Sequence, residues 1–155
     1  MNNSENIINH FYTCFKNKDI KGMQDCYAES AVFNDPVFKD LNAAQVRQMW
    51  AMLIKSGKDM QVEFSTVTAD EHSGRAQWVA SYTFSATGNK VINKVNAIFI
   101  LENGKIISHT DEFNFYQWAK QALGLTGRLL GWTSFLKAKI RKKATNKLHQ
   151  YMAAN

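Results

Sequence analysis

Residues 106–115 alternate in the way of a β-strand that has two different faces. The odd positions place His109 and Asp111 between the apolar residues Ile107 and Phe113. Because successive side chains of a strand point to opposite faces, the two ionisable residues share the more apolar face. A polar side chain on the buried side of a sheet needs a hydrogen-bond partner or a function. The pattern therefore predicts a polar site set into an apolar interior.

The chain before this strand divides into helices and then strands. Apolar residues recur at helical spacing in residues 4–15, 19–27 and 42–56, with Tyr27 on the inward side of the second helix. From residue 60 the period changes to two, and one face of each strand is apolar. Helices followed by an antiparallel sheet with one apolar face predict the α+β class, with the helices packed on that face.

The turn at residues 103–104 sets the register between the last two strands. A two-residue Asn-Gly turn would place Ala97 opposite Thr110, whereas a three-residue loop with Gly104 left-handed would place Ala97 opposite His109. A slip of one residue moves every side chain to the other face, so the buried pattern decides between the two. Only the three-residue loop keeps apolar residues opposite apolar ones, and we therefore expect it.

Composition limits the class of protein. The 155 residues are 45% apolar, which suits one domain with a core, and no apolar run approaches the length of a membrane-spanning helix, about 20 residues. The two cysteines lack the spacing of metal ligands, so we expect a reduced, cytoplasmic protein without a metal or other cofactor. The net charge of +6 is uneven, because residues 113–155 hold 8 basic residues and no acidic one. This asymmetry argues against a general nucleic-acid surface.

The C-terminal segment combines basic residues with a narrow apolar stripe. In residues 134–152 the stripe consists of Leu136, Ile140, Ala144, Leu148 and Tyr151. Such a helix either packs on its own domain or lies on an anionic membrane surface. We favour packing on the domain, because a narrow stripe that includes an alanine gives little energy of membrane insertion. The helix could also cover the mouth of a pocket, with Trp132 and Phe135 as a lid.

Four short motifs occur in an order and spacing that resemble those of a known superfamily. They are Lys-Asp-Ile at residues 18–20, Asn-Asp-Pro-Val at 34–37, Asn-Gly-Lys-Ile at 103–106 and His-Thr-Asp-Glu-Phe at 109–113. Over roughly residues 5–124 the chain resembles the nuclear transport factor 2-like superfamily, in particular its SnoaL-like and ketosteroid isomerase-like members. The resemblance implies that residues 1–125 form a cone, in which a curved antiparallel sheet wraps around N-terminal helices and an apolar pocket. Residues 126–155 would be a basic helical extension.

The resemblance also implies roles for individual residues. Ketosteroid isomerases place a general-base aspartate before Pro-Val, and that position matches Asp35. Their oxyanion-binding Tyr and Asp fall on Phe11 and near Ala97, whose side chains have no hydrogen-bond donor. Steroid isomerisation itself is therefore not expected.

Two further groups in the superfamily have an aspartate on the last strand, and in both it matches Asp111. In limonene epoxide hydrolase the accompanying Arg and Asp fall on Trp78 and Ala80, which excludes that catalytic triad here. In SnoaL-type polyketide cyclases the last-strand aspartate is again the matching residue. The resemblance thus implies a chemical role for Asp111.

We expect the three catalytic candidates, Asp35, His109 and Asp111, to converge in the apolar pocket. An apolar surrounding would raise the pKa of Asp35 as a general base needs, and His109 with Asp111 would form a coupled proton-transfer pair. The simpler alternatives are that Asp35 caps a turn and that the pair is a satisfied core contact with Tyr12 or Asn93. The residues expected to contact a substrate are Phe11, Tyr12, Trp50, Trp78, Tyr82, Asn93, Phe99 and Phe113.

Two classes of function fit these features. The first is an isomerase, cyclase or dehydratase that acts on a small apolar or polycyclic compound. The second is a non-catalytic ligand-binding or protein-interaction module, because a fold does not fix a function. Members of the superfamily often pair through the outer sheet face, where Ile98 and Ile100 lie, so we expect a homodimer. Nucleic acid is not an expected partner, and contact of the C-terminal helix with a membrane surface is the less favoured alternative.

Overall fold

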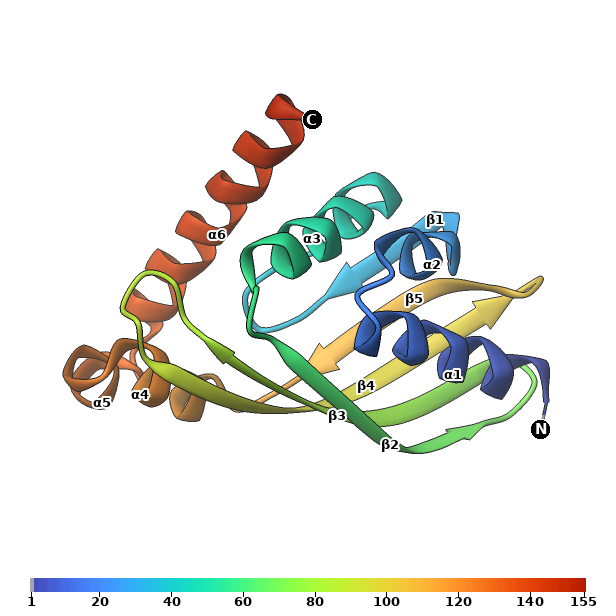
Figure 1. Ribbon diagram of the computed structural model, residues 1–155, viewed down its shortest axis with the longest axis horizontal. Coiled ribbons are helices and arrows are strands. Elements are labelled where there is room, and N and C mark those ends of the chain that lie inside the picture. Colours follow the sequence, from blue (N-terminus) through green and yellow to red (C-terminus); the bar gives the residue numbers. More distant parts are fainter. Residues whose placement is uncertain (1) are drawn as a thin grey trace.

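The computed structural model describes residues 2–155 as a curved five-stranded sheet with helices over its concave face (Figure 1). In chain order the elements are α1 (Asn3–Lys16), α2 (Ile20–Asp25), β1 (Tyr27–Asn34), α3 (Ala43–Ser56), β2 (Gln61–Ala69), β3 (Ser73–Thr83), β4 (Lys90–Glu102), β5 (Lys105–Glu112), α4 (Phe115–Leu123), α5 (Leu125–Leu130) and α6 (Ser134–Ala154). The α+β class and the additional C-terminal helix, both expected from the sequence, are confirmed.

The strands lie in the order β1-β5-β4-β3-β2. The pairs from β2 to β5 are antiparallel, as expected, whereas β1 runs parallel to β5 at the edge of the sheet. The last strand is therefore an inner strand, with β1 on one side and β4 on the other. This placement gives β5 two neighbours that can supply partners to its buried side chains.

The second helix is shorter than its apolar spacing indicates. We expected Tyr27 on that helix, but α2 ends at Asp25, and Tyr27 is the first residue of β1 and pairs with Ile106. The expectation was wrong because Tyr27 also fits the two-residue period of a strand. It lies an even number of residues before Ala31 and Phe33, the other buried residues of β1. Burial against β5 and α3 decides between the two periods.

The turn between β4 and β5 is the two-residue alternative, so the expected three-residue loop is wrong. Asn103 and Gly104 both have positive φ, at 51° and 75°, and Glu102 pairs directly with Lys105. Positive φ at both central positions is the geometry that tight hairpins favour, because its twist matches the twist of the strands.

An irregularity just after this turn restores the buried pattern. The pairing shifts by one residue, so Leu101 lies opposite Ile106 while Ile100 lies opposite Ser108. As a result Ile106 is fully buried and Ile107, which was expected inside, is only partly buried. The extra residue of this bulge reverses the expected face of Ile106 and Ile107, which lie between the turn and Ser108. The positions of β5 from Ser108 onward keep the face expected from the sequence, so His109 and Asp111 both point inward.

The stripe on α6 packs against the domain. Leu136 and Leu148 are buried, with 5% and 0% of their surface exposed, and Ala144 and Tyr151 pack against the main core beside α3. Two polar contacts add to the apolar one, because Arg141 Nε donates to the carbonyl of Pro36 at 2.8 Å and Lys55 lies over the Tyr151 ring. The helix therefore packs on its own domain, which is the arrangement that we favoured from the sequence.

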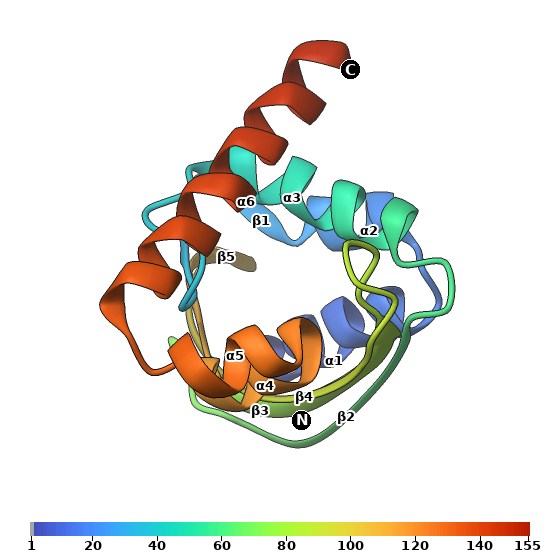
Figure 2. The same ribbon diagram turned by 90° about the vertical axis from the view of Figure 1, so that its left-hand side faces the viewer.

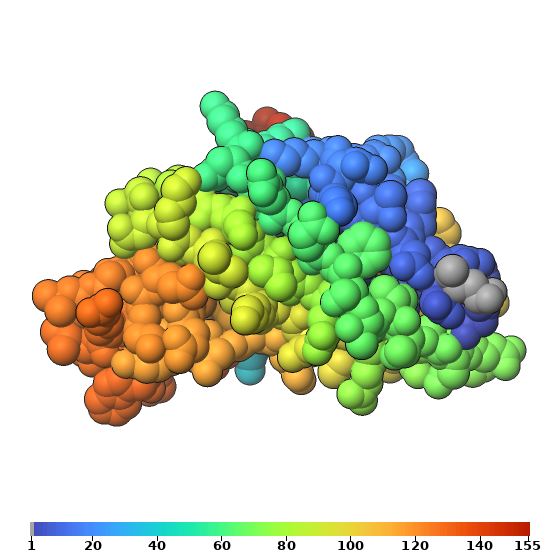
Figure 3. Space-filling view, turned by 60° about the horizontal axis from the view of Figure 1, so that its bottom comes forward, coloured from blue at the N-terminus to red at the C-terminus, as the bar shows by residue number. Residues whose placement is uncertain are grey.

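The helix α6 lines part of a cavity, as the lid hypothesis required, but Trp132 and Phe135 do not form the lid. They are 74% and 72% exposed, and neither lines that cavity. They lie where α5 leads into α6, and α4 and α5 (orange) form the protruding end of the molecule when the convex side of the sheet is viewed (Figure 3). Among residues 2–155, no helix has both the length and the apolar character to cross a bilayer.

Replacement of Leu148 by alanine tests the packing of α6. Because Leu148 is fully buried, we expect Leu148→Ala to lower the free energy of unfolding by about 2–5 kcal/mol in urea denaturation. His149→Ala, at the exposed neighbouring position, is the matched control and should change it by less than about 0.5 kcal/mol. Equal, small effects of the two substitutions would contradict a packed α6.

Candidate functional site

A cavity of about 380 Å³ is lined by residues of the sheet together with residues of α4 and α6. Figure 2 shows these two helices at one end of the curved sheet. The walls of the cavity are mostly apolar and come from the sheet, α3, α4 and α6. Lys143 and Lys147 of α6 line the cavity and are also exposed, so they mark its opening to solvent. The C-terminal extension therefore forms part of the wall.

The structure separates the expected site residues into two groups. Lining the cavity are Asp35, Trp50, Trp78, Tyr82, Asn93, Asp111 and Phe113. Buried beyond the wall, in the main core, are Phe11, Tyr12, Phe99 and His109. Two of the three catalytic candidates thus face the cavity, and the third, His109, lies behind Asp111.

A line of hydrogen bonds runs from α3 through β1 to the end of β5. Trp50 Nε1 donates to the Tyr27 hydroxyl at 2.9 Å, and that hydroxyl lies 2.7 Å from His109 Nδ1. On its other side, His109 Nε2 lies 2.9 Å from Asp111 Oδ1. A carboxylate oxygen only accepts, so the hydrogen between His109 and Asp111 belongs on Nε2 and is donated to Oδ1. With the imidazole hydrogen on Nε2, Nδ1 is the acceptor and the Tyr27 hydroxyl donates to it.

His109 is sealed from water by aromatic rings. It has no exposed surface, and the rings of Phe99, Phe33 and Phe11 lie 4.3, 5.0 and 5.6 Å from the imidazole centre. Such an enclosure holds the imidazole in one orientation, because any rotation would break hydrogen bonds that no water can replace.

Tyr27 is the residue of this hydrogen-bonded line that the sequence analysis missed. It replaces Tyr12 and Asn93, the partners considered for the His–Asp pair. The parallel pairing of β1 with β5 brings it to His109, and this pairing has no local sequence signal. The phase that Tyr27 shares with Ala31 and Phe33 could have identified it as a strand residue.

Asp111 presents one carboxylate oxygen to the protein and the other to the cavity. Oδ1 accepts from His109 and, at 3.4 Å, from Trp78 Nε1. Within residues 2–155, Oδ2 has no hydrogen-bond donor, and the residue lines the cavity with 3% of its surface exposed. Nearby, the buried Tyr12 hydroxyl is also unpartnered, and burial together with the charge of Asp111 raises the pKa of Tyr12 well above its usual value.

Asp35 follows β1 in a turn that its own side chain stabilises. Oδ1 accepts from the backbone N–H groups of Val37 and Phe38 at 2.7 and 2.6 Å, so the turn-capping alternative describes its local role. The carboxyl also lines the cavity. Burial raises the pKa of Asp35 to about 6, with a further increase from the nearby charge of Asp111, although the two backbone hydrogen bonds oppose the rise. A carboxyl with this pKa exchanges its proton near neutral pH.

The site contains two carboxyl groups, Asp35 and Asp111, on an apolar wall. Among residues 2–155, no cluster of three or more His, Cys, Asp or Glu side chains could hold a metal ion. Asp111 has a free oxygen that can accept a proton, and Asp35 has a pKa that lets it donate one. The arrangement suits the transfer of protons to and from a bound apolar molecule.

Comparison with known proteins gives one family and a set of similar folds. The family model described as SnoaL-like domain matches residues 8–109. A "putative polyketide cyclase" from Xanthomonas campestris pv. campestris has 17% identity and a TM-score of 0.65, over 77% of this chain and 96% of that one. IdmH from Streptomyces antibioticus, described in the same words, has 17% identity and a TM-score of 0.66, over 81% and 100%.

An LEH-like epoxide hydrolase from M. tuberculosis is also similar, with 15% identity and a TM-score of 0.64, over 83% of this chain and 96% of that one. Identities this low show a shared fold. Among curated proteins no sequence matches the chain.

The pKa of Asp35 predicts how stability depends on pH. The folded carboxyl, with a pKa of about 6, keeps its proton to higher pH than the unfolded one, whose ordinary value is 3.8. Between these values the folded state binds more protons, so the contribution of Asp35 to the free energy of unfolding falls as pH rises and is constant above about pH 6. The fall should be at most about 3 kcal/mol.

Urea denaturation of the wild type and Asp35→Asn across this pH range measures the effect, because asparagine keeps the oxygen that accepts from the turn. The difference between the two curves should fall with pH. Asp70→Asn is the control, since hydrogen bonds from the backbone N–H groups of His72 and Ser73 lower the pKa of Asp70. Its difference curve should rise with pH near and below 3.8 and be nearly flat at higher pH. A flat Asp35 difference curve would contradict the assignment.

Proposed function

This chain belongs to the family of SnoaL-like domains, and we propose that it binds a small apolar or polycyclic compound in the cavity and transfers protons on it. The reaction class is that of an isomerase, cyclase or dehydratase. The single observation that carries the proposal is that Asp35 and Asp111 share an apolar wall, where buried side chains fix one oxygen of Asp111 and leave the other free. Membership of the family agrees with the resemblance seen in the motifs.

Asp111 is the proposed base. Its Oδ2 takes a proton from a carbon next to a carbonyl group, and the electrons of the broken C–H bond form an enolate. His109 does not reach the substrate, so it is a positioning residue: its hydrogen bond to Oδ1 holds the carboxylate with Oδ2 toward the cavity. Tyr27 extends this support, because it fixes the imidazole from the opposite side.

Asp35 is the proposed acid. With a pKa of about 6 it is partly protonated near neutral pH, and it returns a proton to the enolate carbon or to its oxygen. In a dehydration it would instead protonate a leaving hydroxyl group, whose C–O bond breaks to release water. The two carboxyl groups have different environments, and such differences separate acid from base in pairs of this kind.

The walls favour a flat substrate. Trp50, Trp78, Tyr82 and Phe113 line the cavity, and most of its surface is apolar. Aromatic rings in an apolar cavity of this size suit a ligand of two to four fused rings, roughly the scale of common small-molecule sites. That two similar structures are named for polyketide cyclisation supports a cyclic, carbonyl-containing substrate.

One observation favours the non-catalytic alternative. An enolate oxygen needs hydrogen-bond donors, and Phe11 and Ala97, at the positions that the resemblance assigns to such donors, are buried and apolar. Donors that also line the cavity are the protonated Asp35, the Tyr82 hydroxyl and the Asn93 amide, but within residues 2–155 no buried network holds them as the superfamily donors would be held. A ligand-binding module of the same fold would keep the cavity and lack the chemistry, and the following experiment separates the two. The homodimer expected through Ile98 and Ile100 on the outer sheet face stays a prediction.

Hydrogen exchange on bound ketones tests the proposal. A panel of cyclic ketones with increasing ring number is incubated with the protein in D₂O, and loss of the α-hydrogen signal is followed by NMR. We expect exchange with the wild type and at least about 10²-fold slower exchange with Asp111→Asn, which keeps an oxygen for His109 and Trp78. Ketone binding, measured by calorimetry, should be retained.

Glu112→Gln is the matched control, because Glu112 is an exposed carboxylate next to Asp111 on the other face of the strand. With the Glu112→Gln variant, the α-hydrogens of the ketones should exchange at the wild-type rate. Equal exchange rates for Asp111→Asn and the wild type would contradict the assigned base. Binding without exchange in every variant would establish the non-catalytic alternative.

A further inference from the structure

The end of the molecule formed by α5 and the start of α6 carries a concentrated set of exposed apolar side chains. This α5–α6 tip consists of Leu125, Leu129, Leu130, Trp132 and Phe135. Their exposed fractions are 71%, 62%, 42%, 74% and 72%. Single exposed apolar residues are ordinary on a protein surface, but a contiguous group that includes Trp and Phe marks a contact site.

The tip is held in place rather than loosely attached. Gly127 is buried against α4 so closely that a Cβ atom there would lie 1.8 Å from the carbonyl oxygen of Ala119. The glycine side of α5 therefore faces the domain, and the leucines on its other sides face solvent. The indole of Trp132 is fixed as well, because its Nε1 donates to the Leu129 carbonyl at 3.0 Å.

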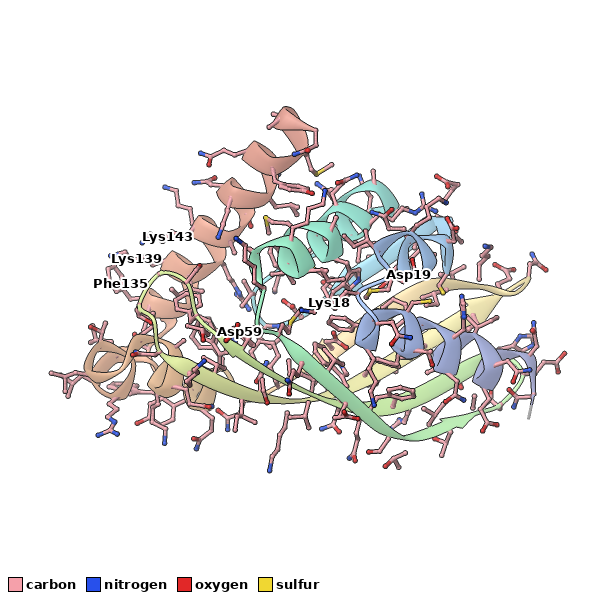
Figure 4. All side chains as sticks on the ribbon, viewed as in Figure 1. Lys18, Asp19, Asp59, Phe135, Lys139 and Lys143 are labelled. Carbon is pink, nitrogen blue, oxygen red and sulfur yellow. The ribbon has the colours of Figure 1, made fainter. Side chains whose placement is uncertain are left out.

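The segment of the chain that contains the tip is basic and lacks acidic residues. Residues 113–155 hold 8 basic residues and no acidic one. On α6, Lys139 and Lys142 follow Phe135 at spacings of four and seven, so the three share the face opposite the buried stripe. Figure 4 shows Phe135, Lys139 and Lys143 following one another along the first turns of α6. No ion pair within residues 2–155 involves Arg128, Lys139 or Lys142.

We propose that the α5–α6 tip binds an anionic lipid surface. Apolar and aromatic side chains enter the boundary between headgroups and acyl chains, while neighbouring Lys and Arg residues remain with the anionic headgroups. A second copy of the chain is a poorer occupant, because two such segments would bring like charges together with no acid to balance them. The surface differs from the apolar stripe of α6, which packs on the domain.

The position of the tip gives lipid binding a consequence for the cavity. Trp118 and Leu123 of α4 and Ile140 of α6 line the cavity. Figure 2 shows that α4, α5 and the start of α6 lie together at one end of the molecule, so the cavity and the tip are close. A docked protein would therefore hold the opening close to the membrane, and an apolar compound could pass between the two without crossing bulk water. That consequence rests on the proposed function, whereas lipid binding by the tip does not.

Co-sedimentation of the full chain with vesicles tests the proposal. Vesicles of phosphatidylcholine with phosphatidylglycerol are compared with vesicles of phosphatidylcholine alone, at low and high salt. We expect binding to the anionic vesicles at low salt, with loss at high salt because the cations are exposed. The double variant Trp132→Ala/Phe135→Ala should bind at least about tenfold more weakly, and Lys139→Gln/Lys142→Gln should lose most of the preference for anionic lipid.

The matched control removes an exposed apolar side chain elsewhere. Ile92→Ala changes a position of β4 that is 56% exposed, and should bind vesicles like the wild type. All replaced side chains are exposed, so unchanged urea midpoints will show that the variants fold.

Tryptophan fluorescence gives a second, independent measurement. Trp50, Trp78 and Trp118 are at most 8% exposed, so a blue shift on addition of vesicles reports Trp132. Trp132→Phe should abolish the shift and retain sedimentation. Absence of binding to anionic vesicles at low salt would overturn the proposal, as would equal loss in the β4 control. Light scattering in which the tip substitutions convert a dimer to a monomer, with vesicle binding unchanged, would assign the tip to self-association and also overturn it.

Discussion

The hydrogen bonds that join Trp50, Tyr27, His109 and Asp111 connect three elements that are distant in the chain. Trp50 comes from α3, Tyr27 from β1, and His109 with Asp111 from β5. In an interior without water, an unpaired indole, hydroxyl or imidazole would be costly, so each element has to meet the others in one alignment. A shift of β1 by one residue along β5 would leave two of these groups without partners. The line therefore fixes the register of the sheet as well as the site.

The same line of hydrogen bonds separates a side of the site that is closed to water from a side that is open to the ligand. Aromatic rings enclose His109 within the line of hydrogen bonds. At the end of the line, the free oxygen of Asp111 faces the apolar cavity. Asp35 enters the cavity from the turn after β1, which its own side chain holds. Two carboxyl groups thus meet the ligand space with unlike surroundings. The α6 helix closes part of this space and also carries the basic residues that follow the exposed tip.

The sequence predicted those features that depend on a repeated local pattern. The period of two placed His109 and Asp111 inside, and the apolar stripe of α6 predicted a packed helix. What it did not predict depends on contacts between distant segments. Tyr27 fits both a helical and an extended period, and only its pairing with β5 selects the strand. The bulge before Ser108 has no distinctive residue, so Ile107 was placed inside in error.

The exposure of the α5–α6 tip also could not be predicted from the sequence. An apolar sequence from Leu125 to Phe135 is compatible with a lid or with an exposed surface. The close approach of Gly127 to Ala119 decides the outcome, because it turns α5 so that its leucines face away from the domain. The candidate site was likewise incomplete: the aromatic residues expected to contact a substrate divide between the cavity wall and the core behind it, and periodicity alone does not distinguish these layers.

The central claim is that Tyr27 donates to His109, which in turn donates from Nε2 to Asp111. ¹⁵N NMR of histidine-labelled protein measures this directly, because the two ring nitrogens have distinct shifts when one is protonated and the other is not. A Tyr27→Phe spectrum assigns the effect to the tyrosine. We predict that His109 carries its hydrogen on Nε2, and that the Nδ1 signal shifts in the variant. A hydrogen on Nδ1, or a spectrum that Tyr27→Phe leaves unchanged, would contradict the account.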